Sequence, residues 1–324
     1  MNFWYTWQIN YLLLLQNFRE VTGGIFDNFF LFVTHGGETI IPSALIAIIY
    51  WCINTEFASF ILLNLGISTF ISDLIKNIAC IYRPWVLDSR IAPVPEALKM
   101  AGGYSFPSGH TQNAVSIWGS IAYKTKNKFF VALLILFILL IGFSRNYLGV
   151  HTPQDVIVSL ILATAVIFWV PKLLQWIKNG KNRDIWVYLS AVLALIVCLV
   201  FEHFKSYPMD YVDGQLLVSP NEMRMSAFPK FGLFLGIFTG LFLNHRFIHF
   251  DGSKGSLLQK IIISVIGIPV FYLIYFNFCE FLLNYIEKKY AWFISSFSVI
   301  FFATVIYPII IIFVRKFIAG KNKE

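Results

Sequence analysis

The stretch "FFVALLILFILLIGF" (Phe129–Phe143) holds no charged residue and no polar side chain, so a helix built from it has no face that favours water. Uncharged runs of similar or greater length recur at Ile185–Phe201, Ile261–Cys279 and Ala291–Val314. About 17–25 mainly apolar residues span a bilayer as a helix, and several of these runs approach or exceed that length. The sequence therefore predicts an all-α, polytopic transmembrane helical bundle.

The composition of the whole chain supports this class. Only 13% of the 324 residues are charged, whereas soluble domains average about 25%. The net charge of +8 is distributed over loops between apolar runs, so we expect no nucleic-acid partner. The four cysteines lie in or beside apolar runs without C-x-x-C spacing, and we interpret them as small buried hydrophobic residues: Cys52, Cys80, Cys198 and Cys279.

We expect nine membrane spans, near residues 38–54, 57–76, 109–123, 129–147, 155–177, 185–203, 227–244, 259–280 and 291–314. If the loop after the third span is cytoplasmic, that face receives 14 of the 25 basic residues, from Lys124 to Lys323. Loops rich in Lys and Arg favour the cytoplasmic side. This orientation predicts an integral plasma membrane protein whose amino terminus lies outside the cytoplasm. The residue usage is compatible with a bacterial membrane.

Polarity divides the chain into three parts. Residues 1–36 mix aromatic and apolar residues with charges, and we expect them to form an amphipathic, interfacial segment. Residues 37–180 hold the polar signals described next. Residues 181–324 add transmembrane helices of unknown role, after a polar extracytoplasmic loop at 205–226.

Three polar clusters fall where predicted spans meet the extracytoplasmic face. The second span ends in "KNIACIYRP", which contains Lys76 and Arg83. These cations are seven residues apart, close to two helical turns, so we expect both on one helix face before Pro84 ends the helix. The third span begins with "PSGH", and the fourth ends in "SRNYLGVHTPQD". Charged groups inside a membrane normally face a shared interior, so the clusters are expected to converge.

The converging residues suit a phosphate group. Arginine matches phosphate oxygens well, and the backbone amides of Ser108, Gly109 and His110 at a helix start would point at an anion. His151 has Asp155 four residues later, which would hold its Nε2 ready as a nucleophile. His110 would then protonate the departing alkoxide as a general acid.

In order, the clusters read K-x6-R-P, P-S-G-H and S-R-x5-H-x3-D. They resemble the three-part signature of the type 2 phosphatidic acid phosphatase superfamily, which also includes glucose-6-phosphatase and the vanadium haloperoxidases. Every signature position is present, and the resemblance covers about residues 25–170. Any one motif alone is more often a helix end, a turn or a surface pair, but the ordered set is specific.

The resemblance implies a six-helix-type phosphatase core that hydrolyses a lipid phosphomonoester or pyrophosphate at the extracytoplasmic face. The reaction would pass through a phosphohistidine and need no cofactor and no metal. The implied catalytic residues are His151, His110 and Asp155. The implied phosphate ligands are Lys76, Arg83, Ser108, Gly109 and Arg145, with Ser144 as a further ligand. The implied partner is a phosphorylated membrane lipid, such as phosphatidic acid, phosphatidylglycerophosphate, diacylglycerol pyrophosphate, a sphingoid-base phosphate or undecaprenyl pyrophosphate.

Two alternatives stay open. A lipid-linked phosphotransferase would share the phosphohistidine step, and the sequence does not separate transfer from hydrolysis. A lipid transporter or flippase would place its charges near the bilayer midplane, often in duplicated halves, which the one-sided charges and unlike halves disfavour. The C-terminal spans could shape a lateral passage for a long chain, support a homodimer or hold another partner, and no residue chooses among these.

Overall fold

A computed structural model describes residues 3–212 and 214–321, so Lys323, at the end of the basic C-terminal stretch, lies outside the described residues. The chain forms two compact units. Unit 1 comprises the residues up to Pro42, Ile67–Trp169 and Lys205–Arg224. Unit 2 comprises Ser43–Gly66, Val170–Phe204 and the chain from Met225 onward. Each unit therefore gathers separate stretches of sequence.

Long apolar helices dominate the described chain, which confirms the predicted all-α membrane bundle. Seven helices are long and apolar enough to cross a membrane: Thr55–Leu87, Lys128–Tyr147, Pro153–Lys178, Arg183–Phe204, Pro220–Ile248, Leu257–Leu283 and Lys288–Phe317. A further pair, Asp27–Gly37 and Ile40–Ile53, would make an eighth span, although it is bent by 46°. The span expected at 38–54 corresponds to the second part of this pair.

The span expected at 109–123 is too short to cross a bilayer. It consists of α7 (Gly109–Ala114), a π-helical turn η3 (Val115–Gly119) and α8 (Ser120–Lys124). Sixteen helical residues extend about 24 Å, against the roughly 30 Å thickness of the hydrocarbon core. The hydroxyls of Ser116 and Ser120 are buried and donate to carbonyls one turn earlier. The segment is therefore an enclosed helix of unit 1.

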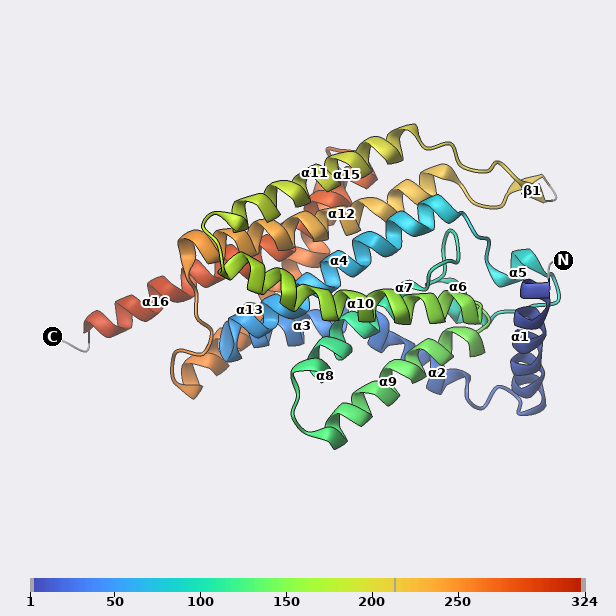
Figure 1. Ribbon diagram of the computed structural model, residues 1–324, viewed down its shortest axis with the longest axis horizontal. Helices are drawn as coiled ribbons and strands as arrows, with labels where there is room; N and C mark the ends of the chain where they lie inside the picture. Colours follow the sequence, from blue (N-terminus) through green and yellow to red (C-terminus); the bar gives the residue numbers. More distant parts are fainter. Residues whose placement is uncertain (1–2, 213, 322–324) are drawn as a thin grey trace. The chain divides into compact units, whose positions relative to one another are not determined.

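Unit 1 is built around the helices that carry the predicted site. Its remaining elements are α1 (Phe3–Val21), α2 (Asp27–Thr34), η1 (His35–Gly37), α5 (Pro84–Leu87), α6 (Pro95–Leu98) and α9 (Lys128–Tyr147). It also contains parts of α4 (Thr55–Ala79), α10 (Pro153–Lys178) and α12 (Pro220–Leu243). In Figure 1, α1 runs across the direction of α9 and α10. Gln8 of α1 exchanges hydrogen bonds with Gln154 at the start of α10, 3.2 Å and 3.1 Å long.

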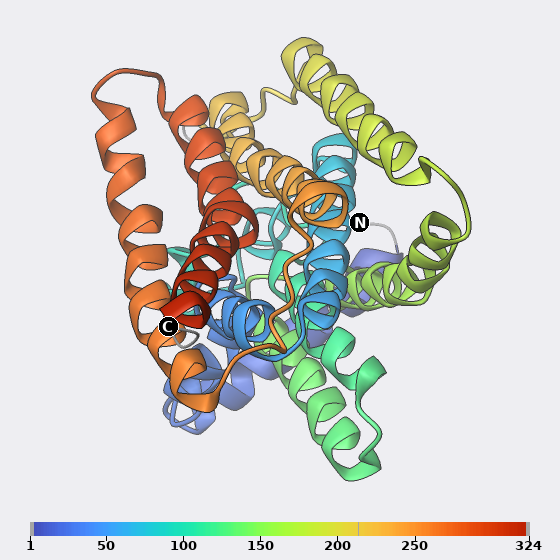
Figure 2. The same cartoon turned by 90° about the vertical axis from the view of Figure 1, so that its left-hand side faces the viewer.

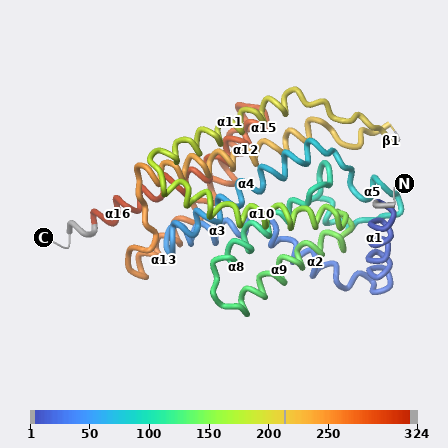
Figure 3. The backbone as a smooth tube through the Cα atoms, in the orientation of Figure 1, coloured from blue at the N-terminus to red at the C-terminus, as the bar shows by residue number. Residues whose placement is uncertain are grey.

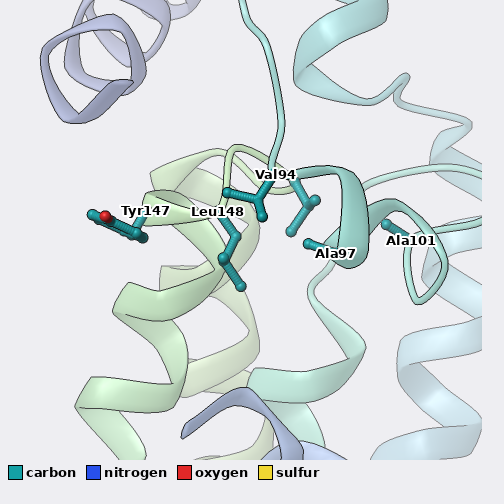
Figure 4. Close-up of a cluster of buried hydrophobic side chains, with 6 residues drawn as sticks. Val94, Ala97, Ala101, Tyr147 and Leu148 are labelled. Atoms are coloured by element: carbon teal, nitrogen blue, oxygen red, sulfur yellow. The ribbon is translucent and has the colours of Figure 1, made fainter. Parts of the chain in front are cut away.

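An apolar cluster fixes the loop that leads to the PSGH motif. Val94, Ala97 and Ala101 pack against Tyr147 and Leu148 at the end of α9 (Figure 4). The amide of Val94 also donates to the carbonyl of Leu148, at 3.1 Å. The loop between α4 and α7 is thereby attached to the segment that contains the third motif.

Unit 2 contains the remaining helices. They are η2 (Ile49–Ile53), α11 (Arg183–Phe204), η4 (Asn244–Ile248), α13 (Leu257–Leu273), η5 (Ile274–Phe278), α14 (Cys279–Leu283), α15 (Lys288–Phe301), η6 (Phe302–Ile306) and α16 (Tyr307–Lys321), while α3 (Ile40–Ile48) crosses the unit boundary. The helices after residue 257 run beside one another (Figure 2). Buried side chains join them, because Trp51 Nε1 donates to Ala303 O at 2.7 Å and the Tyr307 hydroxyl donates to Ile263 O at 2.7 Å.

The described residues contain one short hairpin, formed by the antiparallel strands β1 (Tyr211–Val212) and β2 (Gln215–Leu216). It lies in the predicted extracytoplasmic loop. Figure 3 shows it at the same end of unit 1 as α1 and α5. Since α5 follows the first motif directly, the hairpin lies at the end of the unit that holds the site.

Candidate active site

The His151–Asp155 pair is formed as predicted. His151 lies in the turn between α9 and α10, and Asp155 is in the first turn of α10. The Nδ1 atom of His151 lies 3.1 Å from Oδ2 of Asp155, and both side chains are buried. The amide of Thr152 and the hydroxyl of Ser105 donate to the same carboxylate oxygen. An acceptor at Nδ1 places the ring proton there and leaves Nε2 with a free electron pair.

Arg83 reaches this Nε2. Its Nη1 lies 2.9 Å from Nε2 of His151 and also donates to the carbonyl of Val150 at 2.9 Å. Its other donors hold the loop before the PSGH motif, through Nε to Gly103 O at 3.1 Å and Nη2 to Gly102 O at 2.8 Å. Arg83 therefore joins the first motif to the third and positions the loop between them.

Both histidines favour the neutral form. Burial, followed by the charges of Arg83, Arg145 and Lys76, lowers the pKa of His151 well below its ordinary value. Burial, followed by the charges of Arg145 and His151, also lowers the pKa of His110. Arg83 and Arg145 act on both imidazoles, so side chains of all three motifs lie within electrostatic range of one another.

Lys76 lies on α4, whereas Arg83 immediately precedes α5. We predicted Lys76 and Arg83 on one helix face, which is wrong because α4 ends at Ala79. Cys80 takes a left-handed backbone conformation (φ 47°), and Pro84 begins the new helix α5. The Lys76 ammonium donates to three carbonyls, at 2.8 Å to Tyr104, 3.0 Å to Ser105 and 3.0 Å to Pro107. Its contacts thus stabilise the loop that carries the PSGH motif.

The PSGH motif lies where the loop held by Lys76 enters α7. Gly109 begins α7, and a side-chain carbon added there would meet nothing within 4 Å. The amide of Ser108 donates to the carbonyl of Asp155 at 3.1 Å, so it is not directed at an anion as predicted. The amides of Gly109 and His110 are in the first helical turn, where the helix offers no acceptor. Nε2 of His110 is buried and has no hydrogen-bond partner in the part of the chain that the structure describes.

Arg145 supplies further unpaired donors. The side chain is fully buried, with Nη1 donating to the hydroxyl of Thr34 on α2 at 2.7 Å. Its Nε and Nη2 atoms are buried and have no hydrogen-bond partner within residues 3–212 and 214–321. A buried, unsatisfied charged donor is expensive unless an anion completes it. By contrast, the hydroxyl of Ser144 donates to the carbonyl of Ile141 at 2.6 Å, a contact that does not favour its predicted role as a ligand.

Several supporting residues were not predicted from the sequence. Ser105 bonds Asp155 and lies 3.3 Å from Nδ1 of His151, while Thr34 holds Arg145. Asn146 donates to the carbonyl of His151 at 2.9 Å. Their partners are 46, 111 and 5 residues away in sequence. Ser and Thr are too common for such distant pairs to stand out, although Asn146 within the third motif offered a weak signal.

Three further polar side chains outside the motifs, those of His35, Glu38 and Asp73, bond residues close to them in sequence. His35 and Glu38 form a pair with 3.0 Å between Nδ1 and Oε1. Asp73 accepts from Asn77 one turn later on α4, at 3.1 Å. Within residues 3–212 and 214–321, no three His, Cys, Asp or Glu side chains gather as a set that could hold a metal ion.

Comparison with known proteins places two regions of the chain in one family. Residues 57–179 match the PAP2 superfamily, and residues 228–321 match the transmembrane extension of PAP2 superfamily phosphatases. The first region contains all three motifs. The second covers most of the helices after the hairpin, which the motifs alone do not assign.

Three relatives have recorded functions. Lipid phosphate phosphatase delta of Arabidopsis thaliana is 24% identical over 82% of this chain and 65% of its own length. Undecaprenyl-diphosphatase BcrC of Bacillus subtilis (strain 168) is 34% identical over 44% of this chain and 72% of its own length. Phosphatidylglycerophosphatase B of the same bacterium is 30% identical over 32% of this chain and 54% of its own length.

No solved structure matches the chain significantly. The chain spans just under two thirds of the length of the Arabidopsis relative and a larger share of the length of the undecaprenyl-diphosphatase. Both family regions lie on apolar helices of membrane-spanning length, and the ordered motifs share one buried site. The chain is an integral membrane protein that belongs to the PAP2 superfamily.

Proposed function

We propose that the protein is a membrane lipid phosphatase that hydrolyses a lipid phosphomonoester or pyrophosphate through a phosphohistidine on His151. The observation that carries the proposal is a set of buried side-chain nitrogens that have no hydrogen-bond partner among the described residues, namely Nε2 of His110 and Nε and Nη2 of Arg145. They lie within electrostatic range of a histidine whose tautomer is set by Asp155. The three relatives, all named as phosphatases of lipid phosphates, support the same activity.

In the first step, Nε2 of His151 attacks phosphorus and the bond from phosphorus to the lipid oxygen breaks. Nη1 of Arg83 then has to exchange its hydrogen bond to Nε2 for one to a phosphate oxygen, since both compete for that position. The leaving oxygen takes a proton from His110. The negative charge of the bound phosphate offsets the neighbouring cations, so it favours protonated His110 in the complex.

In the second step, water attacks the phosphohistidine and gives a proton to His110, and the bond from phosphorus to nitrogen breaks. The products are inorganic phosphate and the lipid alcohol, or a lipid phosphate when the substrate is a pyrophosphate. Asp155 and Ser105 stabilise the Nδ1 proton throughout. Arg83 and Arg145 supply the positive charge that the transition state requires, so we expect activity without added metal.

We place the reaction at the extracytoplasmic face because the loop charges favour that orientation. The substrate is chosen among the lipid phosphates that the relatives' names suggest. A panel of undecaprenyl pyrophosphate, phosphatidylglycerophosphate, phosphatidic acid and sphingosine phosphate should give one preferred substrate. Equal yields of inorganic phosphate and lipid product indicate hydrolysis, and a phosphate deficit indicates transfer to another acceptor.

The direct test uses the purified full-length protein in detergent with a chelator present. Wild type should release phosphate and carry an acid-labile label from a 32P-labelled substrate, as a phosphohistidine does. His151→Ala should abolish both. His203→Ala is the matched control, because His203 is exposed at the end of α11, and it should behave as wild type. Phosphate release that persists in His151→Ala would contradict the proposed mechanism.

A further inference from the structure

The segment between the two family regions packs onto the candidate site. We call it the strap, meaning the described residues 205–212 and 214–224. It follows the first family region, which ends at 179, and precedes the second, which begins at 228. By its contacts it belongs to unit 1, together with all three motifs. Its neighbours in sequence, α11 and the rest of α12, belong to unit 2.

The strap is attached by an apolar cluster and by hydrogen bonds. Its residues Tyr207, Val218 and Met223 are buried with Tyr104 of the loop before the PSGH motif. The Tyr207 hydroxyl donates to Oδ1 of Asn77, next to Lys76 on α4, at 2.9 Å. The Tyr82 hydroxyl, next to Arg83, donates to Asp210 of the strap at 2.6 Å. The strap therefore contacts the chain beside both cations of the first motif.

Glu222 of the strap contacts the loop before the PSGH motif. Its Oε1 accepts from the amide of Gly103 at 3.0 Å. Gly103 has φ +62°, and an added side-chain carbon would lie 2.6 Å from Sδ of Met223, so only glycine fits. The carbonyl of Gly103 accepts from Nε of Arg83. The loop is thus held by the strap on one side and by Arg83 on the other.

We propose that Glu222 is a positioning residue for the phosphate site, acting through Gly103 on Arg83 and, through Arg83, on His151. The inference rests on the proposed function of the site. Each link is a described hydrogen bond, of 3.0 Å, 3.1 Å and 2.9 Å. The carboxylate also attracts the guanidinium of Arg83 electrostatically. The C-terminal part of the chain, predicted from the sequence with no assigned role, would thereby supply a residue that positions the site.

The test compares Glu222→Ala, Glu222→Gln and Glu96→Ala in the full-length protein. Glu96 is an exposed carboxylate on α6, in the same loop region, and serves as the matched control. Glu222→Ala should lower kcat roughly tenfold with a smaller change in KM, because a disordered Arg83 no longer aligns the nucleophile. Glu222→Gln should recover most of kcat, since its amide oxygen accepts the same hydrogen bond. Glu96→Ala should match wild type.

A second readout needs no turnover. Inorganic phosphate should raise the Tm of wild type and raise that of Glu222→Ala by less, because ligand binding stabilises the folded protein. Wild-type kcat in Glu222→Ala, an equal loss in the Ala and Gln variants, or an unchanged phosphate-dependent rise in Tm would each overturn the inference. A wild type that binds phosphate without releasing it from lipids would instead overturn the proposed function.

Discussion

Nη1 of Arg83 lies 2.9 Å from Nε2 of His151, so the arginine donates to the nitrogen that the proposed reaction uses for attack. The same side chain bonds three carbonyls, including those of Gly102 and Gly103. In the proposed reaction, a phosphate oxygen that takes over this donor frees Nε2 as the substrate arrives. Substrate binding and activation of His151 are then one event.

This contact predicts a large effect of Arg83→Lys. A lysine keeps the charge but lacks the planar guanidinium, which bonds the carbonyls of the loop and Nε2 of His151 at the same time. We expect kcat/KM to fall by about a hundredfold or more. Arg90→Lys is the control, since the Arg90 side chain is exposed and its guanidinium donates to the nearby Asp88. Near-normal kinetics in Arg83→Lys would refute this role of the guanidinium.

The proposed role of His110 as the general acid predicts a dependence on the leaving group. A lipid alkoxide needs a proton to depart, whereas a nitrophenolate departs unaided. His110→Ala should therefore lower kcat for the lipid phosphate by about 10²–10⁴-fold and affect a nitrophenyl phosphate ester much less. Steady-state kinetics on the two substrates measures the difference. Equal losses on both would assign His110 to phosphate binding instead.

The depressed pKa of His151 predicts its protonation state directly. Burial and the cations Arg83, Arg145 and Lys76 favour the neutral imidazole, so its proton is lost at a lower pH than in an ordinary histidine. At pH 6, below the ordinary value of about 6.5, His151 should still be neutral. Histidine-selective 15N spectra, assigned by the signal missing in His151→Ala, report this state. A His151 signal that is cationic at pH 6 would contradict the expectation.

Ser105 is predicted to orient the nucleophile with Asp155. Ser105→Ala removes one of the donors to the carboxylate and should lower kcat roughly tenfold with little change in KM. Ser116→Ala is a matched control, because Ser116 is equally buried but bonds a carbonyl within its own helix. If both variants lose the same activity, the effect of Ser105 arises from packing.

Thr34 is predicted to matter for stability and for phosphate binding. Thr34→Val keeps the shape but removes the acceptor of Arg145 Nη1, which leaves a buried guanidinium with one partner fewer. The loss should be about 1–3 kcal/mol of unfolding free energy, seen as a lower Tm. Thr22→Val, which removes a hydroxyl bonded within its own turn, should change Tm little. Because phosphate would satisfy the guanidinium, we expect inorganic phosphate to recover part of the loss in Thr34→Val.

The sequence predicted the features that depend on residues close together in the chain, but not the contacts between residues far apart in it. Apolar runs and spacing predicted the membrane helices and the His151–Asp155 pair, which lies within one helical turn. The shared helix for Lys76 and Arg83 was wrong because the backbone at Cys80 turns left-handed, which periodicity does not reveal. The contacts of Ser105 and Thr34 depend on chain packing, so no spacing rule could find them.

The strap has a consequence for how the polypeptide can be divided. A cut in the turn between Lys178 and Arg183 would leave every predicted catalytic histidine on the amino-terminal fragment, yet Glu222 and Tyr207 on the other. That first fragment alone should therefore be a poor catalyst, and co-expression of both pieces should restore turnover. A chimera that joins the part of the chain with the three motifs to another membrane protein should also be a poor catalyst, since it would lack the strap, which follows the motifs in the sequence.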